Sequence, residues 1–96
     1  MRAVLLLLLV LSPALPAYAG PCETLLCMAG KLQGQGGGSD CAQPIADYFS
    51  IIEYGKHWRF NPGATAAARL GYLNSCQADG VGDWPLRINA IYGAVE

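Results

Sequence analysis

Residues 22–41 read CETLLCMAGKLQGQGGGSDC and hold three of the four cysteines. Cys22 and Cys27 lie in a stretch with helical spacing of apolar residues, and a glycine-rich segment separates them from Cys41. Glycine runs of this kind form loops, because they carry no side chains that could build a core. The stretch therefore predicts a helical hairpin closed by disulfide bonding, on which the other segments pack.

The first 19 residues have the features of a signal peptide. A short basic start precedes the apolar run Val4–Leu11, and Ala17-Tyr18-Ala19 has the small-x-small pattern of a cleavage site. The run is far shorter than the roughly 20 residues that span a bilayer, which disfavours a retained anchor. A lipoprotein is also disfavoured, because no lipobox precedes the first cysteine. We expect cleavage near Ala19-Gly20 and export of residues 20–96 as a single helical domain.

The exported part is small and weakly acidic. Seven acidic and five basic residues follow residue 19, since the sixth basic residue is Arg2. No basic patch remains, which argues against nucleic-acid binding through phosphate contacts. Domains near 60 residues bury only about 60% of their unfolded surface and are marginally stable. Small exported domains are usually stabilised by disulfide bonds, and four cysteines can form two of them.

Two helices are expected in the first half of the exported chain. The first covers residues 22–32, with an inward stripe made of Cys22, Leu25, Leu26, Ala29 and Leu32. The second runs from Cys41 or Pro44 to Tyr54 and ends at Gly55. Its apolar side chains recur at i, i+3, i+4 and i+7, as Ile45, Tyr48, Phe49 and Ile52.

Two further helices are expected in the second half. Asn61-Pro62 is a strong helix start, with asparagine at the N-cap and proline in the first turn, and this helix runs to about Cys76. Asp83 can cap a last short helix through Tyr92. The fold class predicted is all-α, a small disulfide-stapled bundle of three main helices plus a short C-terminal helix.

Four cysteines allow three pairings. Cys22 and Cys27 lie about 140° apart around a helix, so they cannot bridge each other. We prefer Cys27–Cys41, which closes the hairpin, with Cys22–Cys76, which ties the third helix to the first. The alternative of Cys22–Cys41 with Cys27–Cys76 is close behind. A zinc site is disfavoured because the spacing lacks a CxxC pair.

The sequence offers no recognisable catalytic machinery. It contains no Gly-x-Ser-x-Gly, no His-Glu-x-x-His and no Cys-x-x-Cys motif. His57 is the single histidine, which gives a metal ion no ligand set once the cysteines form bridges. We therefore expect no enzymatic activity, no cofactor and no metal ion.

Two tryptophans are candidate contact residues for a protein partner. Trp58 lies in the basic-aromatic segment Lys56–Phe60, and Trp84 begins the last helix. Exposed tryptophans are often the anchors of protein interfaces. Both could equally be buried core residues. Segment 56–60 could also touch a phosphate or a membrane surface, although steady membrane binding needs more charge or buried area.

The spaced cysteines, the glycine loop and the segment Tyr48-Phe49-Ser50-Ile51 together resemble the TrbM/KikA family of conjugal transfer proteins. Further residues that carry the resemblance are Cys22-Glu23, Leu26–Gly30, Gly34–Gly38, Cys41, Ile45, Arg69, Leu73, Cys76 and Ile88–Gly93. The resemblance covers nearly all of residues 20–96 and brings no catalytic residue with it. It implies a small periplasmic protein encoded with the mating-pair-formation genes of a conjugative plasmid.

The expected function is that of a non-catalytic periplasmic accessory protein of a type IV secretion system for plasmid transfer. Its partners would be components of the transfer apparatus, reached through protein contacts, and membrane association after signal cleavage is not expected. The alternatives are a membrane-active or lipid-binding helical protein of saposin-like character, a host-killing factor, and a small cell-wall hydrolase.

Overall fold

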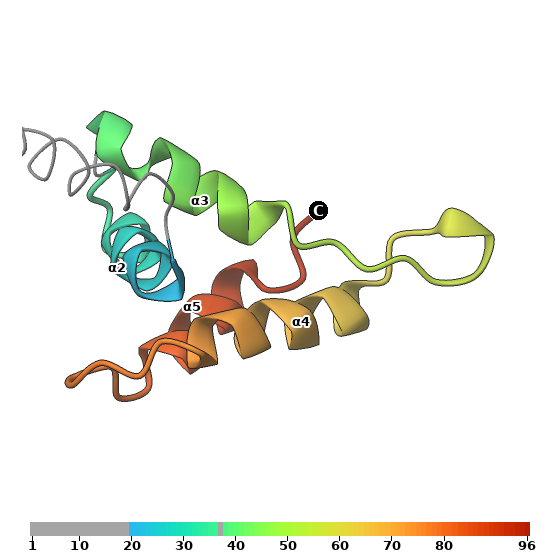
Figure 1. Cartoon of the computed structure of the whole chain (residues 1–96). Coiled ribbons are helices and arrows are strands. Elements are labelled where there is room, and N and C mark those ends of the chain that lie inside the picture. The colour runs from blue at the N-terminus through green and yellow to red at the C-terminus, as the bar shows by residue number, and fades with distance from the viewer. Residues whose placement is uncertain (1–19, 37) are drawn as a thin grey trace, which may run out of the picture.

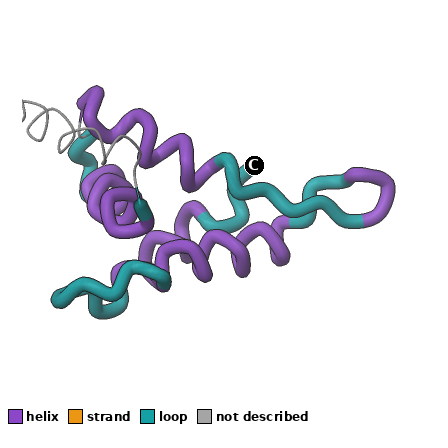
Figure 2. Tube along the Cα trace, viewed as in Figure 1, coloured by secondary structure: helices purple, strands orange, loops and turns teal. Residues whose placement is uncertain are grey.

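The chain has an all-helical fold in which two disulfides hold the helices together (Figures 1 and 2). The computed structural model describes residues 20–36 and 38–96, so the predicted signal peptide, 1–19, lies outside the described residues. The helices are α2 (Pro21–Leu32), η2 (Gly38–Cys41), α3 (Ala42–Phe49), η3 (Lys56–Trp58), α4 (Pro62–Asn74) and α5 (Trp84–Tyr92). The predicted fold class is therefore confirmed.

Helix α2 is the element on which the others pack. It contacts α3, α4 and α5, and α4 also packs along α5. Figure 1 shows α2 nearly end-on while α3 and α4 run across the view, so α2 crosses both at a steep angle. The shared core consists of Leu25, Met28, Tyr48, Leu73 and Ile88. No helix in the described part of the chain is long and apolar enough to cross a membrane.

Both preferred disulfide pairings are confirmed. Cys27 bonds to Cys41 with a Cα–Cα distance of 5.5 Å, and Cys22 bonds to Cys76 with a Cα–Cα distance of 4.8 Å. The first closes the hairpin between α2 and α3. The second ties the start of α2 to the chain just after α4.

The buried face of α2 differs from the predicted stripe. Leu26 was expected to point inward but is 70% exposed, whereas Met28 and Thr24 are fully buried. At 100° per residue, Cys22 and Cys27 lie on the two edges of the face that holds Thr24 and Met28, and Leu26 lies beyond the Cys22 edge. The two disulfides thus fix the rotation of α2 and turn Leu26 outward.

Helix α3 ends at Phe49, five residues before the predicted end at Tyr54. The carbonyl oxygens of Phe49 and Ile51 accept hydrogen bonds from the Arg69 guanidinium, at 3.3 and 3.0 Å. Carbonyl groups at a helix end need such partners when the helix does not continue. The predicted end at Tyr54 is wrong, because the Arg69 side chain on α4 supplies these donors.

The start of α4 follows the prediction. Asn61 is the N-cap, its side-chain oxygen accepts a hydrogen bond from the Ala64 backbone N–H at 3.0 Å, and Pro62 occupies the first turn. The helix ends at Asn74, two residues before the predicted Cys76.

Tyr48 links α3 to α5 inside the core. Its hydroxyl donates to Oδ1 of Asn89 at 2.8 Å, and Nδ2 of Asn89 donates to the carbonyl oxygen of Ala66 at 2.9 Å. Burial raises the pKa of Tyr48 from 10.0 to about 12, and the nearby charge of Arg69 lowers it by a smaller amount. The folded protein therefore holds this proton more firmly than the unfolded chain does.

This pKa predicts a loss of stability in alkali. As the pH rises, the unfolded chain loses the Tyr48 proton first, so the stabilisation is complete below pH 10 and is lost between pH 10 and about 12. The loss amounts to about 3 kcal/mol at the upper end of that window. Urea unfolding at a series of pH values would measure it, with Tyr48→Phe as control. An equally steep alkaline decline in the Tyr48→Phe variant would contradict the prediction.

Candidate interaction surfaces

A loop that doubles back on itself leaves the helical body between α3 and α4 (Figures 1 and 2). We call residues 51–61 the arm. Its two sides meet in an isolated antiparallel bridge between Tyr54 and Phe60. The Gly55 N–H donates to the Arg59 carbonyl at 2.7 Å, and the Asn61 N–H donates to the Glu53 carbonyl at 2.9 Å. These bonds give the arm a defined shape although it lies outside the core.

The tip of the arm, residues 56–59, displays an exposed tryptophan. Trp58 is 83% exposed, and its ring lies edge-on to that of Tyr54 with 6.3 Å between centroids. His57 and Trp58 have φ angles of 58° and 59°, in the left-handed region that few non-glycine residues occupy. Such strain persists only where the surroundings enforce it, and it is concentrated at functional sites. The tight turn holds Trp58 out in solvent.

Thr65 anchors the base of the arm to α4. This fully buried side chain accepts a hydrogen bond from the Glu53 N–H at 2.8 Å and lies 3.3 Å from the Glu53 carbonyl oxygen, to which it can donate. The Thr65 hydroxyl thereby pairs with both the backbone N–H and the backbone carbonyl of Glu53.

Arg69, one turn further along α4, joins two distant segments. It is fully buried, and its guanidinium lies over the rings of Tyr48 and Phe49, at 5.3 and 5.2 Å from their centroids. Burial lowers the pKa of Arg69, yet arginine keeps its proton in proteins. The guanidinium donates to the carbonyl oxygens of Phe49 (3.3 Å), Ile51 (3.0 Å), Tyr92 (2.9 Å), Gly93 (3.2 Å) and Val95 (2.6 Å).

The lysines and arginines of the described residues divide into two groups. Arg69 is buried, Lys31 lies over the Tyr92 ring at 5.7 Å, and the Arg87 guanidinium lies 4.1 Å from the centroid of Trp84. Lys56 and Arg59 instead extend from the exposed tip of the arm. The tip therefore combines an exposed aromatic ring with two positive charges.

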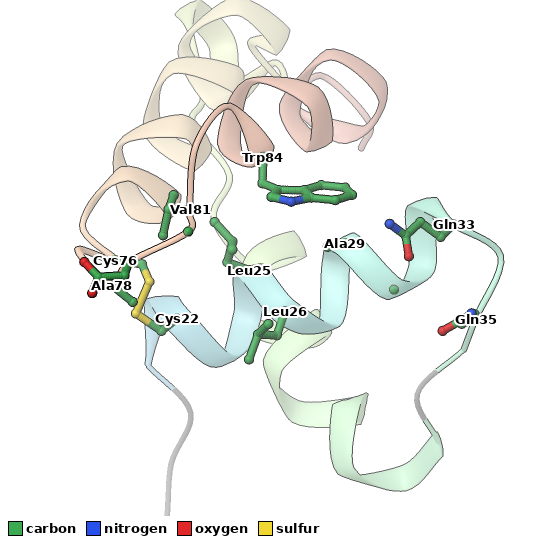
Figure 3. Close-up of a pocket in the computed structure, with 13 residues that line it drawn as sticks. Cys22, Leu25, Leu26, Ala29, Gln33, Gln35, Cys76, Ala78, Val81 and Trp84 are labelled. Carbon is green, nitrogen blue, oxygen red and sulfur yellow. A yellow bond between two sulfur atoms is a disulfide. The ribbon is translucent and has the colours of Figure 1, made fainter.

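A second surface lies at the other end of the molecule, between α2 and the start of α5. It is a groove of about 540 Å³, within the range of roughly 300–1,000 Å³ typical of ligand sites. Figure 3 shows the Trp84 indole across the groove from α2, with the Cys22–Cys76 disulfide at one end. Its apolar lining includes Leu25, Leu26, Ala29, Val81 and Trp84.

The two predicted contact residues have different environments. Trp58 is exposed on the arm, whereas Trp84 is half-buried, packs against the core and lines the groove. Trp58 belongs to the arm before α4 and Trp84 to the start of α5, and Figure 1 shows that the arm and the segment before α5 lie at opposite ends of α4. They belong to two separate surfaces.

Sequence reasoning did not find the roles of Thr65 and Arg69. Both lie on one face of α4 with Leu73, and the buried Cys76 follows the end of the helix, so the spacings from Thr65 are four, eight and eleven residues. This spacing is the signal that could have placed an arginine on the buried face. Within the described residues, no cluster of His, Cys, Asp and Glu could hold a metal ion.

No family model, curated protein or solved structure matches this chain. The resemblance to the TrbM/KikA family thus stays a prediction. The two disulfides are typical of an oxidising compartment outside the cytoplasm.

Proposed function

We propose that this protein is a periplasmic accessory factor of a conjugative plasmid-transfer system and that it acts through protein contacts rather than catalysis. The compartment is supported by the two disulfides. Several residues that carry the family resemblance, including all four cysteines, Tyr48 and Arg69, are those that hold the fold together. The resemblance thus rests in part on residues that stabilise the fold.

The observation that carries the proposal is the exposure of Trp58. A tryptophan held in solvent by a strained turn loses the stabilisation that burial would give, and contact with a partner restores it. Tryptophan is also the residue type most enriched among interface anchors, which cost 2 kcal/mol or more when truncated. We therefore assign the tip of the arm as the contact surface for the transfer apparatus.

The proposal predicts that transfer depends on this one side chain. A donor strain that lacks the gene should conjugate at reduced frequency, and the wild-type gene should restore the frequency. Trp58→Ser should fail to restore it, since a lost anchor of 2 kcal/mol weakens binding about 30-fold. Leu86→Ser is the matched control, because Leu86 is a 61% exposed apolar residue on α5, outside both surfaces.

Cross-linking adds a readout that does not depend on transfer frequency. A photoreactive residue at position 58 should give a discrete adduct in donor cells, while one at position 86 should not. Unchanged transfer by the Trp58→Ser donor, with no adduct from position 58, would refute the proposal.

A further inference from the structure

The arm and the groove of one molecule cannot meet. They lie at opposite ends of α4, whose 13 residues span about 20 Å at 1.5 Å per residue. Yet one surface is a projecting aromatic residue and the other is an apolar hollow with an aromatic wall (Figure 3). We propose that this protein associates with itself head to tail, the arm of one copy entering the groove of the next.

The groove has the chemistry to accept Trp58. Leu26 lines it with 70% of its own surface exposed, which leaves apolar area that a second copy can cover. Trp84 offers an indole face or edge, and aromatic pairs gain stability in offset or edge-to-face arrangements. The volume of about 540 Å³ is ample for one indole ring together with part of the turn that carries it.

Charge complementarity selects a second copy as the occupant. Lys56 and Arg59 place two cations beside Trp58, and residues 54–60 include no acidic residue. At the groove, Asp79 is part of the lining, and the acidic residues Glu23 and Asp83 adjoin lining residues in sequence. Two cations lie near that end: Lys31, which adjoins the lining residue Gly30, lies over the Tyr92 ring, and Arg87 lies against the Trp84 ring. A basic tip thus faces an acidic rim, which favours the contact and fixes its orientation.

The contact is heterologous, because it joins two different surfaces of the same chain. Such contacts extend into rings or open filaments unless something blocks the next step. One tip buries much less than the roughly 800 Å² per partner of a standard interface, so each contact is weak and reversible. This inference goes beyond the proposed function, since it concerns the purified protein in the absence of a transfer apparatus.

Two exposed positions allow a decisive experiment. Trp58→Ser removes the indole from the tip of the arm, and Leu26→Arg places a positive charge in the groove, where it repels Lys56 and Arg59. Sedimentation of the purified, oxidised wild type should show a mean mass that rises with concentration up to about 1 mM, the range in which weak contacts form. Each variant alone should remain a monomer. An equimolar mixture should form a 1:1 dimer and nothing larger, because only one intact arm can meet one intact groove.

Salt provides an independent check. Raising the ionic strength from about 0.1 M to about 1 M shortens the Debye length from roughly 10 Å to roughly 3 Å, so self-association of the wild type should weaken. Circular dichroism of both variants should match the wild type, which excludes unfolding as the cause of their behaviour.

Several results would overturn the inference. They are a wild type that stays monomeric at 1 mM, a Trp58→Ser variant that still self-associates, and a mixture of variants that stays monomeric. Binding of the monomeric wild type to phosphatidylglycerol vesicles through Trp58 would also overturn it, and would assign the tip to a membrane surface instead. In donor cells, an adduct between position 58 and a different protein would support contact with the transfer apparatus, whereas an adduct between two copies of this chain would report self-association, so the two proposals fail separately.

Discussion

Replacement of Cys22 and Cys76 together by serine should lower the free energy of unfolding by about 4 kcal/mol. The bond joins residues 54 positions apart, so its removal frees most of the chain in the unfolded state. Domains of this length are stable by roughly 4–12 kcal/mol in total. The double variant should therefore lose between about a third and all of its stability, which urea titration followed by circular dichroism would measure.

The Cys27–Cys41 bond provides the comparison. It closes a loop with a sequence separation of 14, so its removal by Cys27→Ser with Cys41→Ser should cost about 3 kcal/mol. The prediction is most specific about the order of the two losses: removal of Cys22–Cys76 should cost more stability than removal of Cys27–Cys41. A larger loss on removing the shorter bridge would show that native-state contacts, rather than loop length, determine what each disulfide contributes.

The cysteines are also where sequence reasoning was most successful. Helical spacing turns Cys22 and Cys27 toward different neighbours, and the glycine-rich loop returns Cys41 to the end of α2 near Cys27. These are local constraints, set by the helix repeat and by the length of the connection. The start of α4 at Asn61-Pro62 was predictable for the same reason, since the cap forms within four residues.

The parts that sequence did not predict depend on contacts between distant residues. The periodicity of Ile45, Tyr48, Phe49 and Ile52 continues past Phe49 and suggests a longer helix. Arg69 ends that helix from 18 to 20 residues away, and only the folded structure brings it there. The arm arises from the same cause, because α3 stops early and leaves residues 51–61 to cross to α4.

The sequence identified two tryptophans as candidate contact residues, but it did not show whether their side chains are exposed or buried. An aromatic residue among basic ones marked Trp58 as a contact residue, yet a buried position was equally compatible with the pattern. The partner surface was not predictable, because the groove combines α2, the segment before α5, and the start of α5 itself. Only the rotation of α2 fixed by the disulfides places Leu26 in it.

Arg69→Met should destabilise the protein by about 3–5 kcal/mol, an effect as large as the loss of a disulfide. Methionine fills similar space but has no N–H donors, so five carbonyl oxygens at two chain segments lose their shared partner. Arg87→Met is the matched control. Arg87 is exposed and lies over one ring, so its replacement should cost about 1 kcal/mol or less. Chemical unfolding of both variants measures the difference, and equal losses would contradict the role assigned to Arg69.

A double-mutant cycle isolates the link that Arg69 makes to the C-terminus. Deletion of residues 95–96 removes one of the five carbonyl acceptors, that of Val95, and leaves the new terminal carboxylate on Ala94, which is not one of the acceptors. If the guanidinium joins this segment to α3, the deletion should cost less in the Arg69→Met background than in the wild type. The expected coupling is about 1 kcal/mol, within the range for residues in one hydrogen-bond network. Additive losses would mean that the C-terminal segment is held by other contacts and that Arg69 stabilises the end of α3 alone.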